Sequence, residues 1–181
     1  LPIPPGTDSA AMLADGVARL GIHRLAFSKA QKQWRDRIAF LHAAEGEDWP
    51  DVSDAGLAAS VQDWLAPFVG GITALSGITP DVLGDALASL LPHTLRRRLD
   101  VEAPTHFVAP TGLSHPIDYE SEGAPVLAIR VQELFGLTNH PSIARGQLPL
   151  TLHLLSPAHR PIQITRDLPG FWAGSWASVR A

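Results

Sequence analysis

Residues 152–172 read LHLLSPAHRPIQITRDLPGFW, and this stretch decides the fold class. Two short runs of alternating apolar and polar residues flank a Ser-Pro-Ala-His-Arg turn, which is typical of a β-hairpin. Four apolar side chains are expected to share the core face: Leu152, Leu154, Ile162 and Ile164. Four polar side chains are expected on the opposite face: Thr151, His153, Gln163 and Thr165. The stretch therefore predicts an antiparallel pair with one polar, acid-free face.

A helix is expected directly after this hairpin. Asp167 is a suitable N-cap, and Pro169 fits the first helical turn. Trp172 and Trp176 are spaced i, i+4, and Leu168 and Val179 complete the same face. This spacing favours a helix that packs onto the sheet, although stacking of the tryptophans on single-stranded bases stays open as an alternative.

The chain before residue 103 shows only helical spacing. Predicted helices start after Thr7 or Ser9, with Gly21 as the stop, after Ser28, after Ser53, and at Thr79-Pro80-Asp81, and a short helix covers 92–100. The apolar stripes expected in the core are Trp34, Ile38 and Leu41; Leu57, Val61, Trp64 and Phe68; and Leu83, Leu87, Leu90 and Leu91. The side chains expected to face water on the second helix are Lys29, Lys32, Arg35 and Asp36.

Short alternating runs take over after residue 103. Thr111-Gly112 separates two of them and predicts a hairpin turn. Residues 124–136 suit either a helix, because of Leu127, Val131 and Leu134, or a strand; their length and Gly136 favour the helix. The class is therefore α+β: a helical subdomain over 1–103, then an α+β subdomain over 104–181 with a small, mainly antiparallel sheet of hairpins and a packed C-terminal helix.

Composition limits the function classes. The chain has 181 residues, 45% of them hydrophobic and 18% charged, which fits a globular fold with a proper core. Its net charge of −4 argues against a domain that binds nucleic-acid phosphates through its overall charge alone. Cysteine is absent, so disulfides and thiolate chemistry are excluded, and a cytoplasmic location is expected. No apolar run suits a membrane span, and the Pro-rich start without Met suggests a piece of a longer chain.

No catalytic constellation is recognisable. The only lysines are Lys29 and Lys32, and neither lies in a G-x-x-x-x-G-K-[ST] phosphate loop. A Rossmann glycine motif and a G-x-S-x-G elbow are also missing from the sequence. The chain is therefore predicted to have no catalytic residues and no cofactor of its own.

The spacing of the histidines and acids does not predict a metal site. The chain has 8 histidines, of which His106 and His115 are expected to share a hairpin face. Such spacing is more often that of solvated side chains, so no metal site is predicted. The acidic loop with Glu45, Glu47, Asp48, Asp51 and Asp54 lacks the order of a calcium loop. Favourable interactions with the next helix dipole explain these acids better.

Basic residues give the one binding hypothesis. Arg96, Arg97 and Arg98 spread around a helix and are interpreted as solvated rather than as one phosphate-binding stripe. The hairpin of 152–165 instead offers a polar face with a basic tip. The residues predicted to contact a single-stranded nucleic-acid backbone are Arg145, His153, Arg160, Gln163 and Arg166.

Five long stretches resemble the C-terminal region of the HrpB family, which are bacterial ATP-dependent helicases of the DExH type. These stretches are EGEDWPDVSDAGL (45–57), DWLAPFVGGI (63–72), RRRLDVEAPTHFVAPTG (96–112), PIDYESEGAPVLAIRVQELFGL (116–137) and PLTLHLLSPAHRPIQITRDLPGFWAGSWASVR (149–180). The similarity covers essentially the whole chain, and strings of this length are specific.

The resemblance implies a role rather than a site. It implies a parent helicase whose two motor domains bind ATP and Mg²⁺ upstream of this chain, and an accessory region that docks on them. Single-stranded RNA or DNA is the further partner implied, and no residue-level function is carried over. A purely structural or protein-interaction module, without any nucleic-acid role, remains the alternative.

Overall fold

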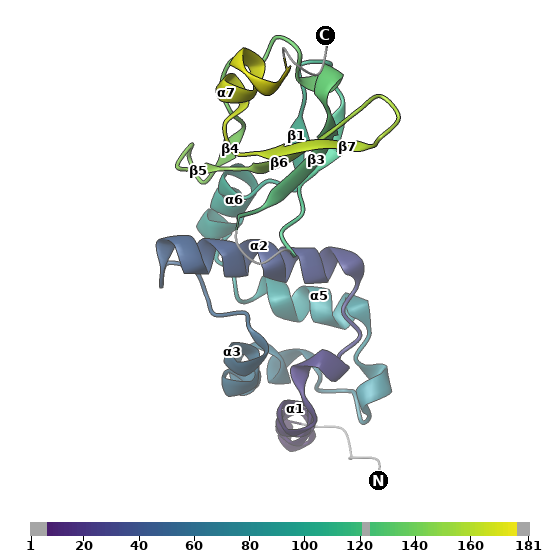
Figure 1. Ribbon diagram of the computed structural model, residues 1–181. Helices are drawn as coiled ribbons and strands as arrows, with labels where there is room; N and C mark the ends of the chain where they lie inside the picture. The colour runs from purple at the N-terminus through teal and green to yellow at the C-terminus, as the bar shows by residue number, and fades with distance from the viewer. Residues whose placement is uncertain (1–6, 121–123, 177–181) are drawn as a thin grey trace. The chain divides into compact units, whose positions relative to one another are not determined.

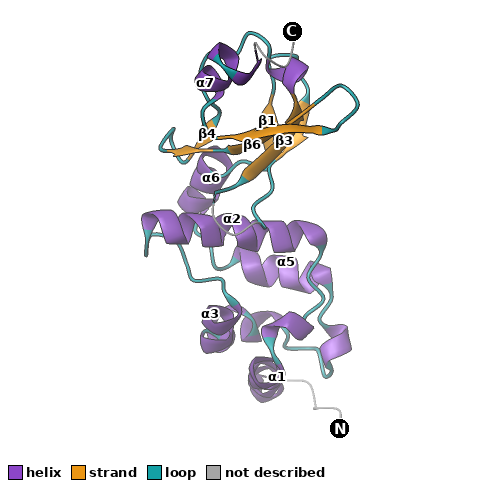
Figure 2. Cartoon of the chain, viewed as in Figure 1, coloured by secondary structure: helices purple, strands orange, loops and turns teal. Residues whose placement is uncertain are grey.

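The computed structural model describes residues 7–120 and 124–176. The chain divides into two compact units, Leu1–Arg97 and Arg98–Ala181, and each is described by itself. Helices form the first unit, and the described strands all lie in the second (Figure 1). The predicted α+β class, with a helical part before the sheet, is confirmed (Figure 2). The division falls within a helix at Arg97, and the subdomains over 1–103 and 104–181 stay a prediction. None of the described helices is long and apolar enough to cross a membrane.

The first unit begins with two helices and a short 3₁₀ turn. Their bounds are α1 Thr7–Leu20, η1 Ile22–Arg24 and α2 Lys29–Glu45. Ser9 is buried inside α1 and is therefore not its N-cap. The Ser28 hydroxyl accepts from the Gln31 N–H, and the Gln31 side chain accepts from the Ser28 N–H, so the predicted start of α2 is confirmed as a capping box.

The buried face of α2 differs in part from the prediction. Ile38 and Leu41 are fully buried as expected, and Trp34 is half-buried. Arg35 was expected to face water, but only 16% of its side chain is exposed. Arg37, which no apolar pattern could indicate, is also buried.

The predicted third helix is broken into three pieces. They are α3 Asp54–Ala59, α4 Val61–Trp64 and η2 Ala66–Phe68. Ser53 caps α3 through the Gly56 N–H, as predicted, but Ser60 then leaves helical geometry while its hydroxyl donates to the Gly56 carbonyl. Because of this break Phe68 turns out of the core and is 37% exposed, contrary to the prediction.

The last helices of this part follow the expected start signals. Their bounds are η3 Leu75–Gly77, α5 Pro80–Ala88 and α6 His93–Glu102. The Thr79 hydroxyl accepts from the Val82 N–H, which confirms the cap and the Pro start of α5. Leu83, Leu87 and Leu91 are buried, whereas Leu90 is half-buried.

The second unit opens with the predicted hairpin. Strand β1 His106–Val108 pairs antiparallel with β2 Ser114–Pro116. The turn contains Gly112 at φ 90°, a conformation that favours glycine. The turn at Thr111-Gly112 is therefore confirmed.

The prediction of a helix over residues 124–136 is wrong. Residues Val126–Arg130 form strand β3, and Val131–Leu134 form the 3₁₀ turn η4. Leu127 and Ile129 are buried while Ala128 between them is exposed, which is the period of a strand. The strand wins because β3 pairs in parallel with a strand 25 residues further on, Val126 with Thr151, and a local helical pattern cannot reveal that partner.

A three-stranded sheet forms the centre of this unit, in the order β3-β6-β7. Strand β6 Thr151–Leu155 is antiparallel to β7 Pro161–Thr165, and a separate small pair joins β4 Ser142–Ile143 to β5 Leu148–Pro149. Leu127, Ile129, Leu152 and Leu154 are buried on one face of the sheet and build the core.

Helix α7 Leu168–Ala173 follows the sheet and lies on one side of it (Figure 1). Asp167 accepts from the Gly170 N–H at 3.0 Å, so the predicted cap is confirmed. Phe171 is buried, and Trp172 donates through its indole N–H to the Leu137 carbonyl at 3.0 Å. The predicted contribution of Val179 lies outside the described residues.

Candidate nucleic-acid interface

The β6–β7 hairpin carries most of the predicted contacts, and its register contains a bulge. Leu155 pairs with Pro161, but Leu154 pairs with Gln163, so β7 has one extra residue at Ile162. A shift of one residue exchanges the two faces of a strand. Downstream of the bulge, β7 therefore presents the opposite alternation to the one that its sequence predicts.

The predicted polar face is consequently wrong. His153 pairs with Ile164, which is 65% exposed, and both lie on the outer face of the sheet. Gln163 pairs with the buried Leu154 and lies on the core face. The structure thus separates His153 from Gln163 by the thickness of the sheet.

The hairpin tip is polar and exposed. The Ser156 N–H donates to the Arg160 carbonyl at 2.8 Å, and the Arg160 N–H donates to the Ser156 hydroxyl at 3.1 Å. His159 sits between them at φ 61°. These bonds fix the backbone of the turn and leave the Arg160 side chain in solvent, where it can meet an anion.

Arg145 lies on a different turn, between β4 and β5. Its Nη2 atom donates to the Glu102 carboxylate at 3.2 Å, and 61% of its side chain is exposed. Figure 1 draws this turn and the β6–β7 turn at opposite ends of the sheet region. Arg145 and Arg160 therefore do not converge on one spot.

Arg166 is also remote from the hairpin tip. It follows Thr165, the last residue of β7, whereas Arg160 precedes Pro161, the first. With a rise of about 3.3 Å per residue, the two backbone positions are roughly 20 Å apart. The five predicted contacts are therefore distributed over this unit and do not form one surface.

A buried acid that sequence reasoning missed lies nearby in the same unit. Glu133 of η4 is 5% exposed and accepts from the Thr111 hydroxyl at 2.8 Å. The His115 Nε2 atom lies 3.1 Å from the same carboxylate oxygen, and Arg130 Nη2 lies 3.4 Å from the other. This carboxylate thus joins the β1–β2 hairpin to the end of β3. The partners are distant in sequence, so no spacing pattern could have indicated them.

These contacts keep the Glu133 carboxylate charged. The hydrogen bond from Thr111, the larger cause, and the one from His115 lower the pKa of Glu133, while burial opposes the shift. Both the hydroxyl and the imidazole bond to the carboxylate rather than to each other. In a hydrolytic triad the histidine lies between the hydroxyl and the acid and takes the proton of the hydroxyl. Here the histidine does not contact the hydroxyl, so this cluster does not activate Thr111 and instead stabilises the fold.

The expected sharing of a face by His106 and His115 is wrong. His106 pairs with Pro116, and His115 pairs with Phe107, so the two histidines point to opposite faces of the hairpin. No group of three or more metal-binding side chains occurs in residues 7–120 and 124–176.

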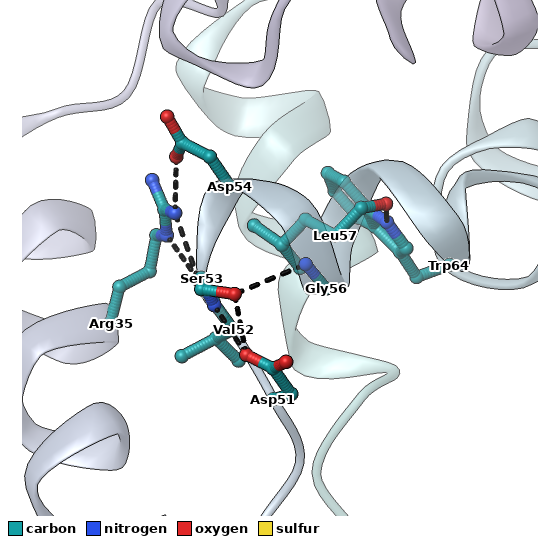
Figure 3. Close-up of polar contacts among 8 residues, drawn as sticks. All are labelled: Arg35, Asp51, Val52, Ser53, Asp54, Gly56, Leu57 and Trp64. Carbon is teal, nitrogen blue, oxygen red and sulfur yellow. Dashed lines mark hydrogen bonds and ion pairs between the residues drawn. The ribbon is translucent and has the colours of Figure 1, made fainter.

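Figure 3 shows what the acids around residue 53 do. Asp51 accepts from the Ser53 hydroxyl at 2.6 Å and from the Ser53 N–H at 3.0 Å, and these two bonds, in that order, lower its pKa. Asp54 pairs with Arg35 at 2.8 Å, and Arg35 also donates through Nε and Nη2 to the Val52 carbonyl at 3.0 and 2.8 Å. The Asp54 carboxylate therefore links α3 to α2 through Arg35, whereas Asp51 orders the N-cap Ser53 at the start of α3.

Two arginines of the basic run are likewise structural. Arg96 donates to the carbonyls of Leu91 at 2.9 Å and Ala88 at 2.7 Å, which satisfies the C-terminal end of α5. Arg98 donates to Glu102 at 2.9 Å. Arg97 is exposed. Arg96 and Arg97 are thus exposed, as the solvated interpretation expects, whereas Arg98 is half-buried, and Arg96 also bonds to the backbone.

Phe171 and Trp172 of α7, together with Trp176 after its end, form a cluster with Phe135. Trp172 and Trp176 are 5.9 Å apart, and each lies within 6 Å of both Phe135 and Phe171. Packing, the favoured interpretation, accounts for both tryptophans, which are half-buried.

The chain matches the model of a known protein family over its C-terminal two thirds. The model of the HrpB C-terminal family, described as "ATP-dependent helicase C-terminal", matches residues 64–181. The chain belongs to this family. All five predicted contacts, Glu102 and Glu133 lie within the matched HrpB C-terminal range, whereas Arg35 and the acidic loop precede it.

A curated relative and two solved structures extend the HrpB similarity to most of the chain. "ATP-dependent RNA helicase HrpB" of Escherichia coli is 42% identical over 171 residues, which is 93% of this chain. Two crystal structures of the E. coli protein, one described as a DExH-box NTPase and one as a DEAH/RHA helicase, superpose with TM-scores of 0.84 and 0.80 at 40% and 38% identity, over 92% of this chain. The chain spans only 21% of the length of these relatives.

Proposed function

We propose that this chain is the C-terminal accessory domain of a bacterial ATP-dependent RNA helicase and that it docks on the motor domains of the same polypeptide. One observation carries the proposal: the similarity at 42% identity covers 93% of this chain but 21% of an ATP-dependent RNA helicase. The role of this region is then to complete the helicase rather than to act alone.

Catalysis is proposed to lie outside this chain. Its two lysines lie on α2 and are not preceded by a phosphate loop, so ATP and Mg²⁺ belong to the motor domains. Within the described residues, the best-connected acids, Glu102 and Glu133, are bonded to arginine, histidine and threonine partners of the scaffold. Such contacts stabilise a fold, and they engage both carboxylates with partners of the scaffold.

Contact with single-stranded nucleic acid is the finer part of the proposal. The candidate residues remain Arg145, His153, Arg160, Gln163 and Arg166. Their separation favours scattered backbone contacts along a strand of RNA over one compact site, and Gln163 is the weakest candidate because it lies on the core face. Contacts to phosphate need no common face when the ligand is long.

The alternative is a purely structural or interaction module. A net charge of −4 and the dispersal of the candidate arginines support it, because phosphate binding is driven by concentrated positive charge. The RNA-contacting domain and the purely structural or interaction module share the docking role, and they differ only in whether RNA is bound.

Docking is tested by mixing this chain with the remainder of its parent helicase, expressed separately, and measuring association by calorimetry. Association and a change in RNA-stimulated ATP hydrolysis are expected, with no hydrolysis by the chain alone. Absence of association would contradict the docking role, and nucleotide turnover by the isolated chain would contradict a non-catalytic one. Titration with labelled single-stranded RNA at low salt separates the two versions.

A further inference from the structure

The turn between β4 and β5 holds three successive residues in the left-handed region. Ala144, Arg145 and Gly146 have φ values of 52°, 59° and 78°. Glycine adopts this conformation freely, but alanine and arginine do so at a cost in free energy. Strained non-glycine residues persist only where their surroundings fix them, and they concentrate at functional positions.

Glu102 supplies the contacts that fix this turn. Its backbone carbonyl accepts from the Ala144 N–H at 2.8 Å, and its carboxylate accepts from Arg145 Nη2 at 3.2 Å. Only 2% of the Glu102 side chain is exposed, so the anchor is rigid. The same residue thus holds both the backbone and the side chain of the turn.

The Arg145 guanidinium is only partly used by this contact. One of its nitrogens bonds to a carboxylate oxygen that also accepts from Arg98 Nε at 2.9 Å, so Glu102 is shared between two cations. A guanidinium offers five N–H donors, and 61% of the Arg145 side chain is exposed. Its outer donors remain available to an anion from solvent.

Backbone donors accompany this side chain. No hydrogen bond to the N–H of Arg145 or of Gly146 is found among the described residues, although the neighbouring Ala144 and Gln147 N–H groups are both bonded. Arg145 and Gly146 are both exposed. Successive N–H groups in a turn create a small concave region of positive potential that suits phosphate oxygens.

We propose that the β4–β5 turn binds a phosphate group of a single-stranded RNA backbone through Arg145 and the adjacent N–H groups, and that Glu102 is its positioning residue. The inference rests on the proposed role in an RNA helicase, and it assigns one specific phosphate contact to this turn. A fork-shaped guanidinium beside backbone donors matches the geometry of a phosphodiester. The site recognises phosphate and not base identity.

The first test measures binding of a fluorescently labelled U20 RNA to the full chain at several salt concentrations. Arg145→Gly removes the guanidinium and accommodates the positive φ, so the turn keeps its shape. It is expected to weaken binding about threefold to tenfold at low salt and to reduce the slope of log affinity against log salt by about one. Arg19→Ala is the control, because Arg19 is an 80% exposed arginine in the other unit, paired with Asp15, and it should change neither quantity.

The second test locates the contact by NMR. Addition of U20 should shift the amide signals of Arg145 and Gly146, and inorganic phosphate should shift the same signals more weakly. Shifts confined to the turn Ser156–Arg160 would overturn the proposal, as would a response to inorganic phosphate without one to RNA. Unchanged RNA affinity in Arg145→Gly, or no RNA binding by the unmodified chain, would overturn it too.

The positioning role of Glu102 needs a double-mutant comparison. Glu102→Gln should weaken RNA binding when Arg145 is present and should have no further effect in the Arg145→Gly background, because its influence passes through that guanidinium. An equal loss in both backgrounds would show general destabilisation and contradict the positioning role. Docking to the motor, measured separately, should be unaffected by Arg145→Gly, so failure of the phosphate site leaves the accessory role standing.

Discussion

The His140 ring joins the start of α7 to the strand region through two backbone groups. Its Nδ1 atom accepts from the Leu168 N–H at 2.9 Å, and its Nε2 atom lies 2.7 Å from the Leu150 carbonyl. Because Nδ1 accepts a hydrogen bond from the Leu168 N–H, Nε2 carries the hydrogen that is donated to the Leu150 carbonyl. These two bonds fix the orientation of the ring between the two backbone groups.

Replacing this ring should loosen α7. His140→Ala leaves a backbone donor and a backbone acceptor without their partner and is expected to lower the free energy of unfolding by about 1–3 kcal/mol. Hydrogen exchange of the Leu168 amide should accelerate, because that amide loses its acceptor. His93→Ala, a change to an exposed histidine on α6, should shift stability by less than about 0.5 kcal/mol. Equal effects of the two changes would contradict the proposed link.

Glu133 should make stability depend on pH in the acidic range. Its pKa in the folded chain lies below the ordinary value of 4.5, so the charged form contributes stability above that value and loses it as the pH falls through the folded pKa. Glu133→Gln should thus be less stable than the unmodified chain near neutral pH, and the difference should shrink on acidification below 4.5. Thermal melting of both chains across this range measures it.

The cause of this shift can be tested separately. Thr111→Ala removes the hydroxyl that lowers the Glu133 pKa most, so the value should move back towards 4.5. An NMR titration of the Glu133 carboxyl carbon reports the change directly. An unaltered titration would assign the shift to His115 and Arg130 instead.

Arg35 should not tolerate lysine. Its guanidinium bonds to the Val52 carbonyl through two nitrogens, to Asp54, and lies 5.0 Å above the Phe27 ring. Lysine cannot reproduce this forked and stacked geometry, so Arg35→Lys is expected to cost about 1–3 kcal/mol in urea unfolding. Arg19→Lys, at an exposed ion pair, should cost less than about 0.5 kcal/mol.

Neighbouring arginines of the basic run should differ. Arg96→Ala removes the side-chain donor to the Leu91 and Ala88 carbonyls, of which Ala88 keeps the Leu91 N–H, and should cost about 1 kcal/mol. Arg97→Ala, an exposed position one residue on, should be within about 0.5 kcal/mol of the unmodified chain. A comparable loss in both variants would indicate a general charge effect rather than capping.

The bulged register predicts which apolar residues of the hairpin matter. Ile164 is 65% exposed, so Ile164→Thr should change stability by less than about 0.5 kcal/mol. Leu154 is fully buried on the adjacent strand, so Leu154→Ala should lower the free energy of unfolding by about 2–5 kcal/mol. A large loss for Ile164→Thr would support the unbulged register instead.

Local signals were sufficient for the starts of helices. Ser28, Ser53, Thr79 and Asp167 all cap through a hydrogen bond to an N–H three residues on, and such a bond depends only on neighbouring residues. The β1–β2 turn was predictable for the same reason, because Gly112 supplies the required φ within the turn itself.

Features that depend on distant partners were not predictable. Residues 126–130 have helical as well as strand character, and the partner strand 151–155 decides between them. In the sequence, Arg35 and Glu133 have the pattern of ordinary surface charges. Their partners, the Val52 carbonyl and the Thr111 hydroxyl, are distant in the sequence and are brought close only by the fold. The bulge in β7 separates His153 from Gln163, and no signal in the sequence places Arg145 near the β6–β7 hairpin.

The extra residue in β7 has a consequence for how relatives diverge. Insertion or loss of a single amino acid near Ile162 would exchange the two faces of this strand, so Ile164 would move to the side of Leu152 and Leu154, and Gln163 would move to the outer side. A sequence alignment that ignores this irregularity would therefore compare side chains that point in opposite directions.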